Sequence, residues 1–233
     1  MTVGNPACAR HANVLQSRLM TLKRLFDRGV LRTGWINAGA SILLAAGVFL
    51  ASKIYDALNH GPAVLHLRTP LDDALPLVPL FVIPYVSLEP IIYFSLIVFL
   101  IFRTRIFQSA SLALIVAMLV SYVVYFLAQT EVIRPTITGT DLFSGMIRGV
   151  YAGDNPFNDF PSLHTSLSTI IAIHWGRTDR RLGILAASWT ALIVASTVLV
   201  KQHYVADVAS GLLLAWGASW LTGKLFLRQE VRP

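Results

Sequence analysis

Two segments of the chain combine histidine with residues that can move protons or bind phosphate. The first, DFPSLHTSLS, covers residues 159–168 and places His164 at the start of an otherwise apolar stretch. The second, STVLVKQHYVADVASG, covers residues 196–211 and contains His203 and Asp207. Because an ionisable group at the mouth of a membrane helix is costly to desolvate, such residues are candidates for a functional site.

The spacing of these residues predicts that they meet in space. His203 and Asp207 are four positions apart, so on a helix they share one face and the carboxylate can reach an imidazole nitrogen. His164 and His203 are 39 positions apart, which equals about two membrane crossings of ~20 residues each. A chain that descends from His164 therefore returns to the same level at His203. Two imidazoles and one carboxylate are predicted to lie together at one face of a membrane.

Two kinds of chemistry suit two histidines and an aspartate. A metal site is the first, but no third nitrogen or sulfur ligand occurs nearby at a useful spacing. Covalent catalysis fits the set better: one imidazole attacks, the carboxylate fixes its tautomer, and the second imidazole protonates the leaving group. We therefore expect an enzyme that uses no metal and no cofactor.

The neighbouring residues indicate that the group attacked is a phosphate. Ser162 follows Pro161 where a helix is predicted to begin, and free backbone amides and the positive end of the helix dipole attract anions there. Arg134, in the segment EVIRPT, and Lys201 are two of only five basic residues expected on this side of the membrane. Hydroxyl, amide, guanidinium and ammonium groups together describe a phosphate pocket.

The elements that must position these residues are predicted membrane helices. Of the 233 residues, 55% are hydrophobic and only 13% are charged, which favours a membrane protein over a soluble one. The segment PLVPLFVIPY before the second span is apolar but broken by prolines, which predicts an interfacial or re-entrant approach. We predict an all-α polytopic membrane protein with six spans, at Trp35–Ile54, Pro84–Phe102, Ser109–Ala128, Ser162–Gly176, Leu182–Val200 and Tyr204–Phe226.

The two ends of the chain flank this six-helix catalytic domain, which we place at 35–226. In the N-terminal segment 1–34, apolar residues recur at helical spacing with basic residues between them. This pattern predicts an amphipathic helix on the cytoplasmic leaflet, and a helix packed on the protein's own loops is the alternative. Residues 227–233 are expected to form a short cytoplasmic tail.

The basic residues predict the orientation of the chain. With six spans, fourteen of the nineteen lysines and arginines fall on the side that holds both termini, and five fall on the other. The positive-inside rule then places both termini in the cytoplasm and the histidine site on the extracytoplasmic side. A multi-pass protein of the plasma membrane is expected, although an organelle membrane whose lumen faces the site obeys the same rule.

The charge does not indicate a nucleic-acid partner. The net charge of +7 is explained by topology, and no segment is large enough to form a soluble domain with a basic face. The single cysteine, Cys8, excludes a disulfide within the chain. The expected partners are the lipid bilayer and a membrane lipid that carries a phosphate, and the oligomeric state is not predicted.

Three motifs resemble those of the type 2 phosphatidic acid phosphatase superfamily. They are FPSLH at 160–164, the segment 196–207 with Ser196 at its start and HYVAD at its end, and the RP dipeptide at 134–135. The resemblance implies a metal-independent, six-helix lipid phosphatase or phosphotransferase. It further implies that His203 is the nucleophile that forms a phosphohistidine, that Asp207 orients it, and that His164 is the general acid.

The resemblance also implies phosphate-binding roles, with some departures from the family pattern. Arg134 and Ser162 would bind phosphate, and Ser196 is a further candidate, although its hydroxyl can instead bond its own helix. The lysine usual in the first motif is Leu127 here, and the arginine of the third motif is Thr197. Lys201 is predicted to replace one of these missing cations.

The second motif has Leu163 where the family usually has glycine. The motif style therefore is similar to the branch related to inositol-phosphorylceramide synthases. Two enzymatic outcomes stay open: a lipid phosphatase, in which water resolves the phosphohistidine, and a phospho-head-group transferase, in which an alcohol does. A phosphodiester donor carries less charge and needs fewer cations, so the missing cations bear on this choice.

Two functions from other classes compete with that of an enzyme. A proton-coupled transporter predicts internal repeats and ionisable groups near the membrane midplane, whereas the chain shows no repeat and its ionisable trio lies near one face. A structural scaffold would explain the hydropathy but not the trio. Glu89, near the top of the second span, is either an interfacial residue or a pocket residue that contacts a head-group hydroxyl.

Overall fold

The computed structural model describes residues 29–30, 33–62 and 65–227. Within these residues the fold is all-α, because the only β pairing is two isolated bridges, Leu65 with Thr130 and Glu131 with Phe157. The long helices are α2 (Gly34–Leu58), α5 (Leu88–Phe102), α6 (Thr104–Leu127), α8 (Leu163–Thr178), α9 (Arg180–Leu199) and α10 (Val205–Phe226). The shorter ones are α3 (Pro70–Ala74), η2 (Pro79–Phe81), α4 (Val82–Val86) and α7 (Leu142–Gly153).

The polytopic membrane fold predicted from hydropathy is confirmed. Five helical segments among the described residues are long and apolar enough to cross a membrane: α2, the run Pro79–Phe102, α6, α9 and α10. The run Pro79–Phe102 joins η2, α4 and α5, so the second predicted span begins earlier than Pro84. The fourth predicted span corresponds to α8, which has 16 residues, and the total of six spans stays a prediction.

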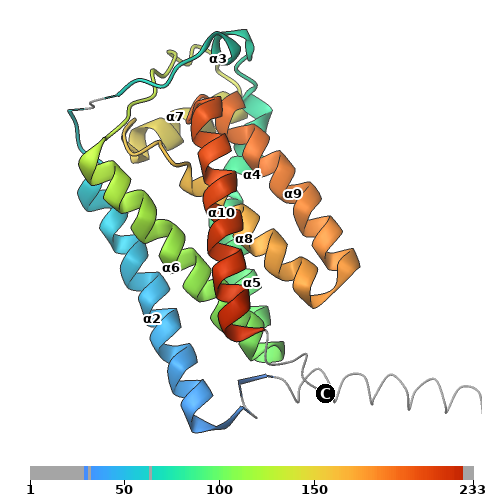
Figure 1. Cartoon of the computed structure of the whole chain (residues 1–233). Coiled ribbons are helices and arrows are strands. Elements are labelled where there is room, and N and C mark those ends of the chain that lie inside the picture. Colours follow the sequence, from blue (N-terminus) through green and yellow to red (C-terminus); the bar gives the residue numbers. More distant parts are fainter. Residues whose placement is uncertain (1–28, 31–32, 63–64, 228–233) are drawn as a thin grey trace, which may run out of the picture.

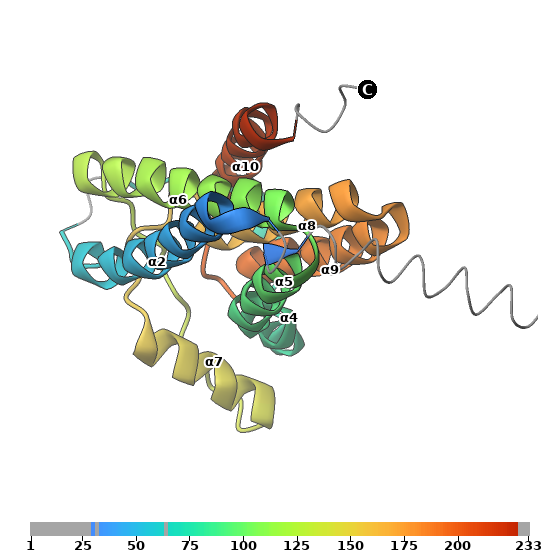
Figure 2. The ribbon, with the colours of Figure 1, turned by 90° about the horizontal axis from the view of Figure 1, so that it is seen from below.

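Helix α8 is the central helix of the bundle, which explains its short, polar sequence. It packs against α5, α6, α9 and α10 (Figures 1 and 2). Its buried side chains include three hydroxyl residues, Thr165, Ser166 and Ser168. A helix enclosed by other helices has no need of the large apolar residues that contact lipid, so hydropathy alone marks it weakly.

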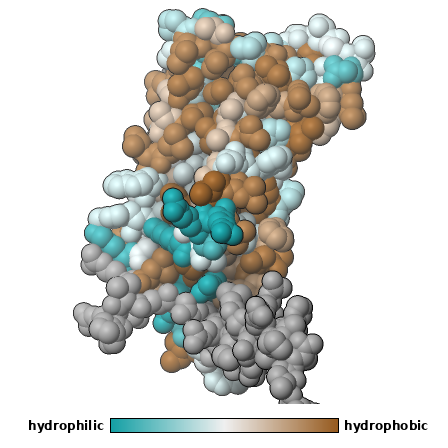
Figure 3. Space-filling view, turned by 90° about the vertical axis from the view of Figure 1, so that its right-hand side faces the viewer, coloured by the Kyte–Doolittle hydropathy of each residue, from teal (hydrophilic) through white to brown (hydrophobic). Residues whose placement is uncertain are grey.

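Small side chains face inward and large apolar ones face outward. The core of α6 includes Ala110, Ala113 and Ala117, none of them exposed, and such small residues let membrane helices approach closely. Leu43, with 74% of its side chain exposed, is typical of the outer surface. Figure 3 shows apolar residues over most of one face, with polar ones at the top and in one lower cluster. Small residues in the core and large apolar residues on the outer surface are the arrangement that a lipid environment requires.

The two long connections lie at one end of the bundle, and α2 begins and α10 ends at the other (Figure 1). An even number of crossings requires this arrangement. Helices α3 and α7 belong to the long connections and cover the upper end. The predicted amphipathic helix of 1–34 lies almost wholly outside the described residues, as does the tail of 227–233 beyond Leu227.

A close contact joins the first turns of α8 and α10. The backbone N–H of Ser162 donates to the carbonyl of Asp207 at 3.1 Å. Gly211 permits this approach, because a Cβ at that position would lie 2.7 Å from the carbonyl oxygen of Ser162 and 3.0 Å from Cβ of Thr165. The obstructing atoms belong partly to the backbone, so a larger residue would have to separate the two helices.

We predict that Gly211→Ala lowers the stability of the protein by about 1–3 kcal/mol, the usual result of overpacking a core. Gly217→Ala, on the same helix, is the matched control, because a Cβ there meets nothing within 4 Å and alanine is the better helix former. Thermal unfolding in detergent measures both variants. Gly211→Ala should unfold at a lower temperature than the native chain and Gly217→Ala at an equal or higher one; equal behaviour of the two variants would contradict the close-contact explanation.

Candidate active site

His203 and Asp207 meet at the beginning of α10. The Asp207 carboxylate accepts a hydrogen bond from the backbone N–H of Tyr204 at 2.7 Å, which caps the helix. Its Oδ2 atom also lies 3.6 Å from Nδ1 of His203, within ion-pair distance but longer than a hydrogen bond. The second oxygen of Asp207 is buried and has no hydrogen-bond partner. Since Nδ1 of His203 faces the carboxylate, Nε2 is the nitrogen free to react.

His164 faces this pair from the first turn of α8. Its ring centroid lies 6.1 Å from that of His203. On its other side it stacks on the ring of Tyr85 from α4, with centroids 4.1 Å apart and planes inclined by 14°. The phenol of Tyr125 donates to the carbonyl of Pro161 at 2.7 Å, which holds the start of α8 in place. The structure therefore brings the two histidines and Asp207 together, as their spacing predicts.

Ser162 occupies the N-cap position of α8. Its hydroxyl oxygen accepts a hydrogen bond from the backbone N–H of Thr165 at 3.3 Å, and the residue is fully buried. This is the capping role expected of a serine at a helix start. The serine lies beside the triad because its own backbone N–H is bonded to Asp207.

Arg134 is fixed by backbone carbonyls next to the triad. Its guanidinium donates to the carbonyl of Asp154 at 2.6 Å, to that of Asn155 at 3.2 Å, and to the Gln202 side chain at 2.5 Å. The ring of Tyr151 lies 4.9 Å from the guanidinium carbon. The Nε–H of Arg134 is buried and has no partner. The arginine is thus held rigidly beside the residue that precedes His203, with one donor unused.

Lys201 and Ser196 are not placed with the triad. Lys201 adopts a positive φ of 56°, and its ammonium donates to the carbonyls of Asp72 and Leu75, at 3.0 and 2.6 Å. These bonds tie the end of α9 to the α3 segment. Ser196 is fully buried in α9, where its hydroxyl donates to the carbonyl of Ile193 at 2.6 Å. Neither residue lines the cavity that holds both histidines.

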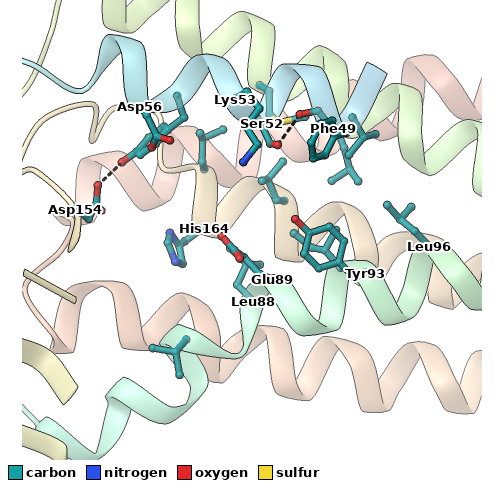
Figure 4. Close-up of a pocket in the computed structure, with 18 of the residues that line it drawn as sticks. Phe49, Ser52, Lys53, Asp56, Leu88, Glu89, Tyr93, Leu96, Asp154 and His164 are labelled. Atoms are coloured by element: carbon teal, nitrogen blue, oxygen red, sulfur yellow. Dashed lines mark hydrogen bonds between the residues drawn. The ribbon is translucent and has the colours of Figure 1, made fainter. Parts of the chain in front are cut away.

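That cavity has a volume of about 800 Å³ and is lined by α2, α4, α5, α6, α7 and α8. One end contains His164, His203 and Gln202, and the other is apolar. Figure 4 shows Asp154 and His164 at one end of the labelled residues and Leu96 at the other. A second pocket of about 300 Å³ is lined by Arg134, Lys201 and also His203, so His203 contributes to both spaces.

Two further carboxyl groups, those of Asp154 and Asp159, line the same cavity. Burial raises the pKa of Asp159 well above its usual value, and the negative charge of Asp207 raises it further, while Arg134 lowers it. Burial likewise raises the pKa of Asp154, and Arg134 again opposes the shift. One oxygen of Asp159 is buried without a hydrogen-bond partner. The site thus contains carboxyl groups whose neutral forms are favoured.

Sequence reasoning did not identify several residues of this site. Tyr85 stacks on His164, and its local sequence does not distinguish it from a core or interface aromatic. Gln202 bonds Arg134 and lines the cavity, but nothing in its local sequence marks it apart from the adjacent His203. Asp159 was noticeable as a carboxylate at a helix mouth, and its position beside PSLH was the available signal. Among the described residues, no group of three or more histidine, cysteine or acidic residues could hold a metal ion.

Comparison with known proteins agrees with this geometry. A family model described as the PAP2 superfamily matches residues 57–221, a range that includes Arg134, His164, His203 and Asp207. Neither the curated proteins nor the solved structures gave a significant match to the chain.

We predict that Asp159→Asn stabilises the protein at pH 8 and has little effect near pH 4. The folded state raises the pKa of Asp159, so the contribution of this group to stability is complete below its usual pKa and is lost as the pH rises through the raised value. The amide cannot ionise and so avoids that loss. Thermal unfolding of both proteins across this pH range measures the difference.

Asp141→Asn is the control with the opposite sign. Hydrogen bonds from Ser144 lower the pKa of Asp141, so its contribution is present above its usual pKa and is lost as the pH falls through the lowered one. This variant should be no more stable than the native chain at pH 8, with the difference shrinking in acid. An Asp159→Asn protein that unfolds at a lower temperature than the native chain at pH 8 would contradict the burial argument.

Proposed function

Because this chain belongs to the PAP2 superfamily, we propose that it transfers the phosphate of a membrane lipid through a phosphohistidine on His203. Membership in this family makes it a lipid enzyme of the phosphatase or phosphotransferase type. The proposed mechanism rests on the arrangement of His203, Asp207 and His164 at one end of a cavity whose other end is apolar. A lipid can place its phosphate at that end and its hydrocarbon in the remainder.

The first step forms a bond between His203 and phosphorus. Nε2 of His203 attacks, the bond from phosphorus to the leaving oxygen breaks, and His164 gives that oxygen a proton. Asp207 stabilises the positive charge that develops on the His203 ring, from its position 3.6 Å from Nδ1. In the second step, a water or alcohol oxygen attacks phosphorus, the P–N bond breaks, and His164 takes up the proton.

Phosphate binding is proposed for Arg134 and for the start of α8. The buried, unpartnered Nε–H of Arg134 is available to an anion, and the first turn of α8 presents the positive end of a helix dipole capped by Ser162. For Lys201 and Ser196 we propose no direct phosphate contact, because their polar atoms are bonded elsewhere.

A head-group transferase is the second candidate, and the scarcity of cations favours it. At the position of the usual family lysine, Leu127 is 71% exposed and does not line the cavity. At the position of the usual arginine, Thr197 is buried, and its carbonyl accepts from the backbone N–H groups of Gln202 and His203. A phosphodiester, with one negative charge fewer than a phosphomonoester, suits a site with a single fixed arginine.

We predict that His203→Ala reduces lipid turnover to background and that Asp207→Asn lowers it by at least about a hundredfold. Asparagine can still cap α10, so its effect should be on the rate and not on folding. The assay follows phosphate release from phosphatidic acid and a polyprenyl diphosphate without added metal, and turnover of a phosphatidylinositol-type diester with and without an alcohol. Retention of the phosphoryl group on the denatured native protein would identify the intermediate.

The matched control is His66→Ala, an exposed histidine that lines neither cavity and should leave turnover unchanged. Phosphate release that depends on His203 would indicate a phosphatase. Diester turnover that requires an alcohol would indicate a transferase. Full activity of His203→Ala on every substrate would rule out the covalent mechanism.

We also propose that both termini are cytoplasmic and that the site is extracytoplasmic, on the evidence of the basic residues. The single cysteine offers a direct test. A membrane-impermeant maleimide should not label Cys8 in intact cells that express the chain, and should label it after permeabilisation. In the variant Cys8→Ser with His66→Cys, the new thiol should react in intact cells. Labelling in the reverse order would invert the topology.

A further inference from the structure

The cavity lining includes three charged residues that the phosphate chemistry does not use, Lys53, Asp56 and Glu89. Lys53 from α2 and Glu89 from α5 both line it. Figure 4 shows them on opposite walls, between His164 on one side and Tyr93 and Leu96 on the other. Both side chains are exposed to the cavity and not buried in protein. A charged band therefore separates the histidine end of the cavity from its apolar end.

Both residues lie below the end of the membrane bundle. Lys53 is five residues before the end of α2, about 7.5 Å along its axis. Glu89 is on the first turn of α5, whose last residue, Phe102, lies about 20 Å further along. Ionisable groups at such depth are costly and usually serve a ligand, a partner or a pathway.

Neither residue has an oppositely charged partner among the described part of the chain. Lys53 lies 5.4 Å from the ring centre of Phe49, a neighbour on its own helix. No salt bridge joins it to Glu89, although the two face one another. A pair that merely neutralised itself would be in contact. The gap between them is open space in which a polar group can be held from both sides.

Beyond this band the cavity suits hydrocarbon. Its deeper lining includes Leu100, Phe107, Leu114 and Met118. Helix α2 packs along α6 and not along α5, so the walls that carry Lys53 and Glu89 are separated. Three zones follow one another: a phosphate site at His164 and His203, a charged band, and an apolar region.

We propose that Lys53 and Glu89 recognise a polar linkage between the phosphate and the hydrocarbon of the lipid. Lys53 donates a hydrogen bond to a carbonyl or hydroxyl oxygen of this linkage, and Glu89 accepts one from a hydroxyl or amide N–H. The linkage is that of a glycerol- or sphingoid-based lipid phosphate. A phosphate attached directly to a hydrocarbon chain, as in a polyprenyl phosphate, would leave both charges unpaired. This inference rests on the proposed function of the same cavity and specifies its substrate class.

The test compares a lipid phosphate that has this linkage with one that lacks it. The probes are a 1-acylglycerol phosphate and a prenyl phosphate of matched carbon number, and their binding is measured with His203→Ala protein in detergent, so that no turnover intervenes. The acylglycerol phosphate should bind at least about tenfold more tightly, the usual effect of a hydrogen bond to a charged group. A sphingoid phosphate in a third arm shows whether an amine or amide linkage is preferred.

Substitution of Lys53 or Glu89 should remove the preference for the acylglycerol phosphate and leave binding of the prenyl phosphate unchanged. Lys53→Met and Glu89→Gln, each added to His203→Ala, should weaken the acylglycerol phosphate about tenfold and leave the prenyl phosphate unchanged. Glu89→Asp, which keeps an acceptor, should retain most of the preference. Lys224→Met and Glu131→Gln are matched controls, because neither residue lines either of the two cavities described above, and both should bind like the parent.

Three results would overturn the inference: equal affinity of the parent for the two lipids, equal loss of both lipids in Lys53→Met or Glu89→Gln, or no binding of either. Equal loss would assign the two residues to the phosphate itself. The proposed function fails separately, if turnover by the native chain does not require His203. If the lipids bind selectively but turnover does not require His203, the cavity recognises the lipid and the chemistry differs from the proposed one.

Discussion

The geometry of the site depends on the contact between the first turns of α8 and α10. One backbone hydrogen bond, from Ser162 to Asp207, and one absent side chain, at Gly211, bring these helix ends together. His164 follows directly in one helix and His203 directly precedes the other, so their separation is a property of backbone packing. Because α8 is enclosed by other helices and α10 is bonded to its start, the two rings are positioned before any ligand arrives.

This contact creates an electrostatic problem, because two positive helix ends and Arg134 share a small region. Three carboxyl groups lie in the same region, those of Asp159 and Asp207, which are buried, and that of Asp154, which is partly exposed. The Asp207 carboxylate already accepts a hydrogen bond at the start of α10 and faces His203. Asp159 and Asp154 have raised pKa values because burial disfavours their charged forms. An arriving phosphate would disfavour those forms further, so proton uptake by these carboxyl groups can accompany its binding.

The parts of the site that follow from membrane crossing were predictable from the sequence, and the parts that depend on loop conformation were not. Hydropathy and the spacing of His164, His203 and Asp207 were sufficient to bring the triad together, because helices that cross a bilayer have nearly fixed length. Lys201 was expected beside the phosphate, but its left-handed backbone turns the ammonium toward carbonyls of the α3 segment. Nothing local in the sequence specifies that turn. Lys53 and Glu89 gain meaning only when α2 and α5 are seen on opposite walls of one cavity.

The position of His203 between two spaces constrains how a second substrate reaches phosphorus. In phosphoryl transfer the attacking and leaving oxygens or nitrogens lie roughly in line. If His203 carries the phosphoryl group, the next nucleophile must approach from the side opposite to the P–N bond, which is the side that the leaving group vacates. His164 lines the larger cavity and not the smaller pocket, so proton transfer also belongs to that side. Water or alcohol must therefore follow the path of the departed lipid through the larger cavity. The smaller pocket is lined by Arg134 and Lys201 but not by His164, so a nucleophile there would lack the residue that takes up its proton.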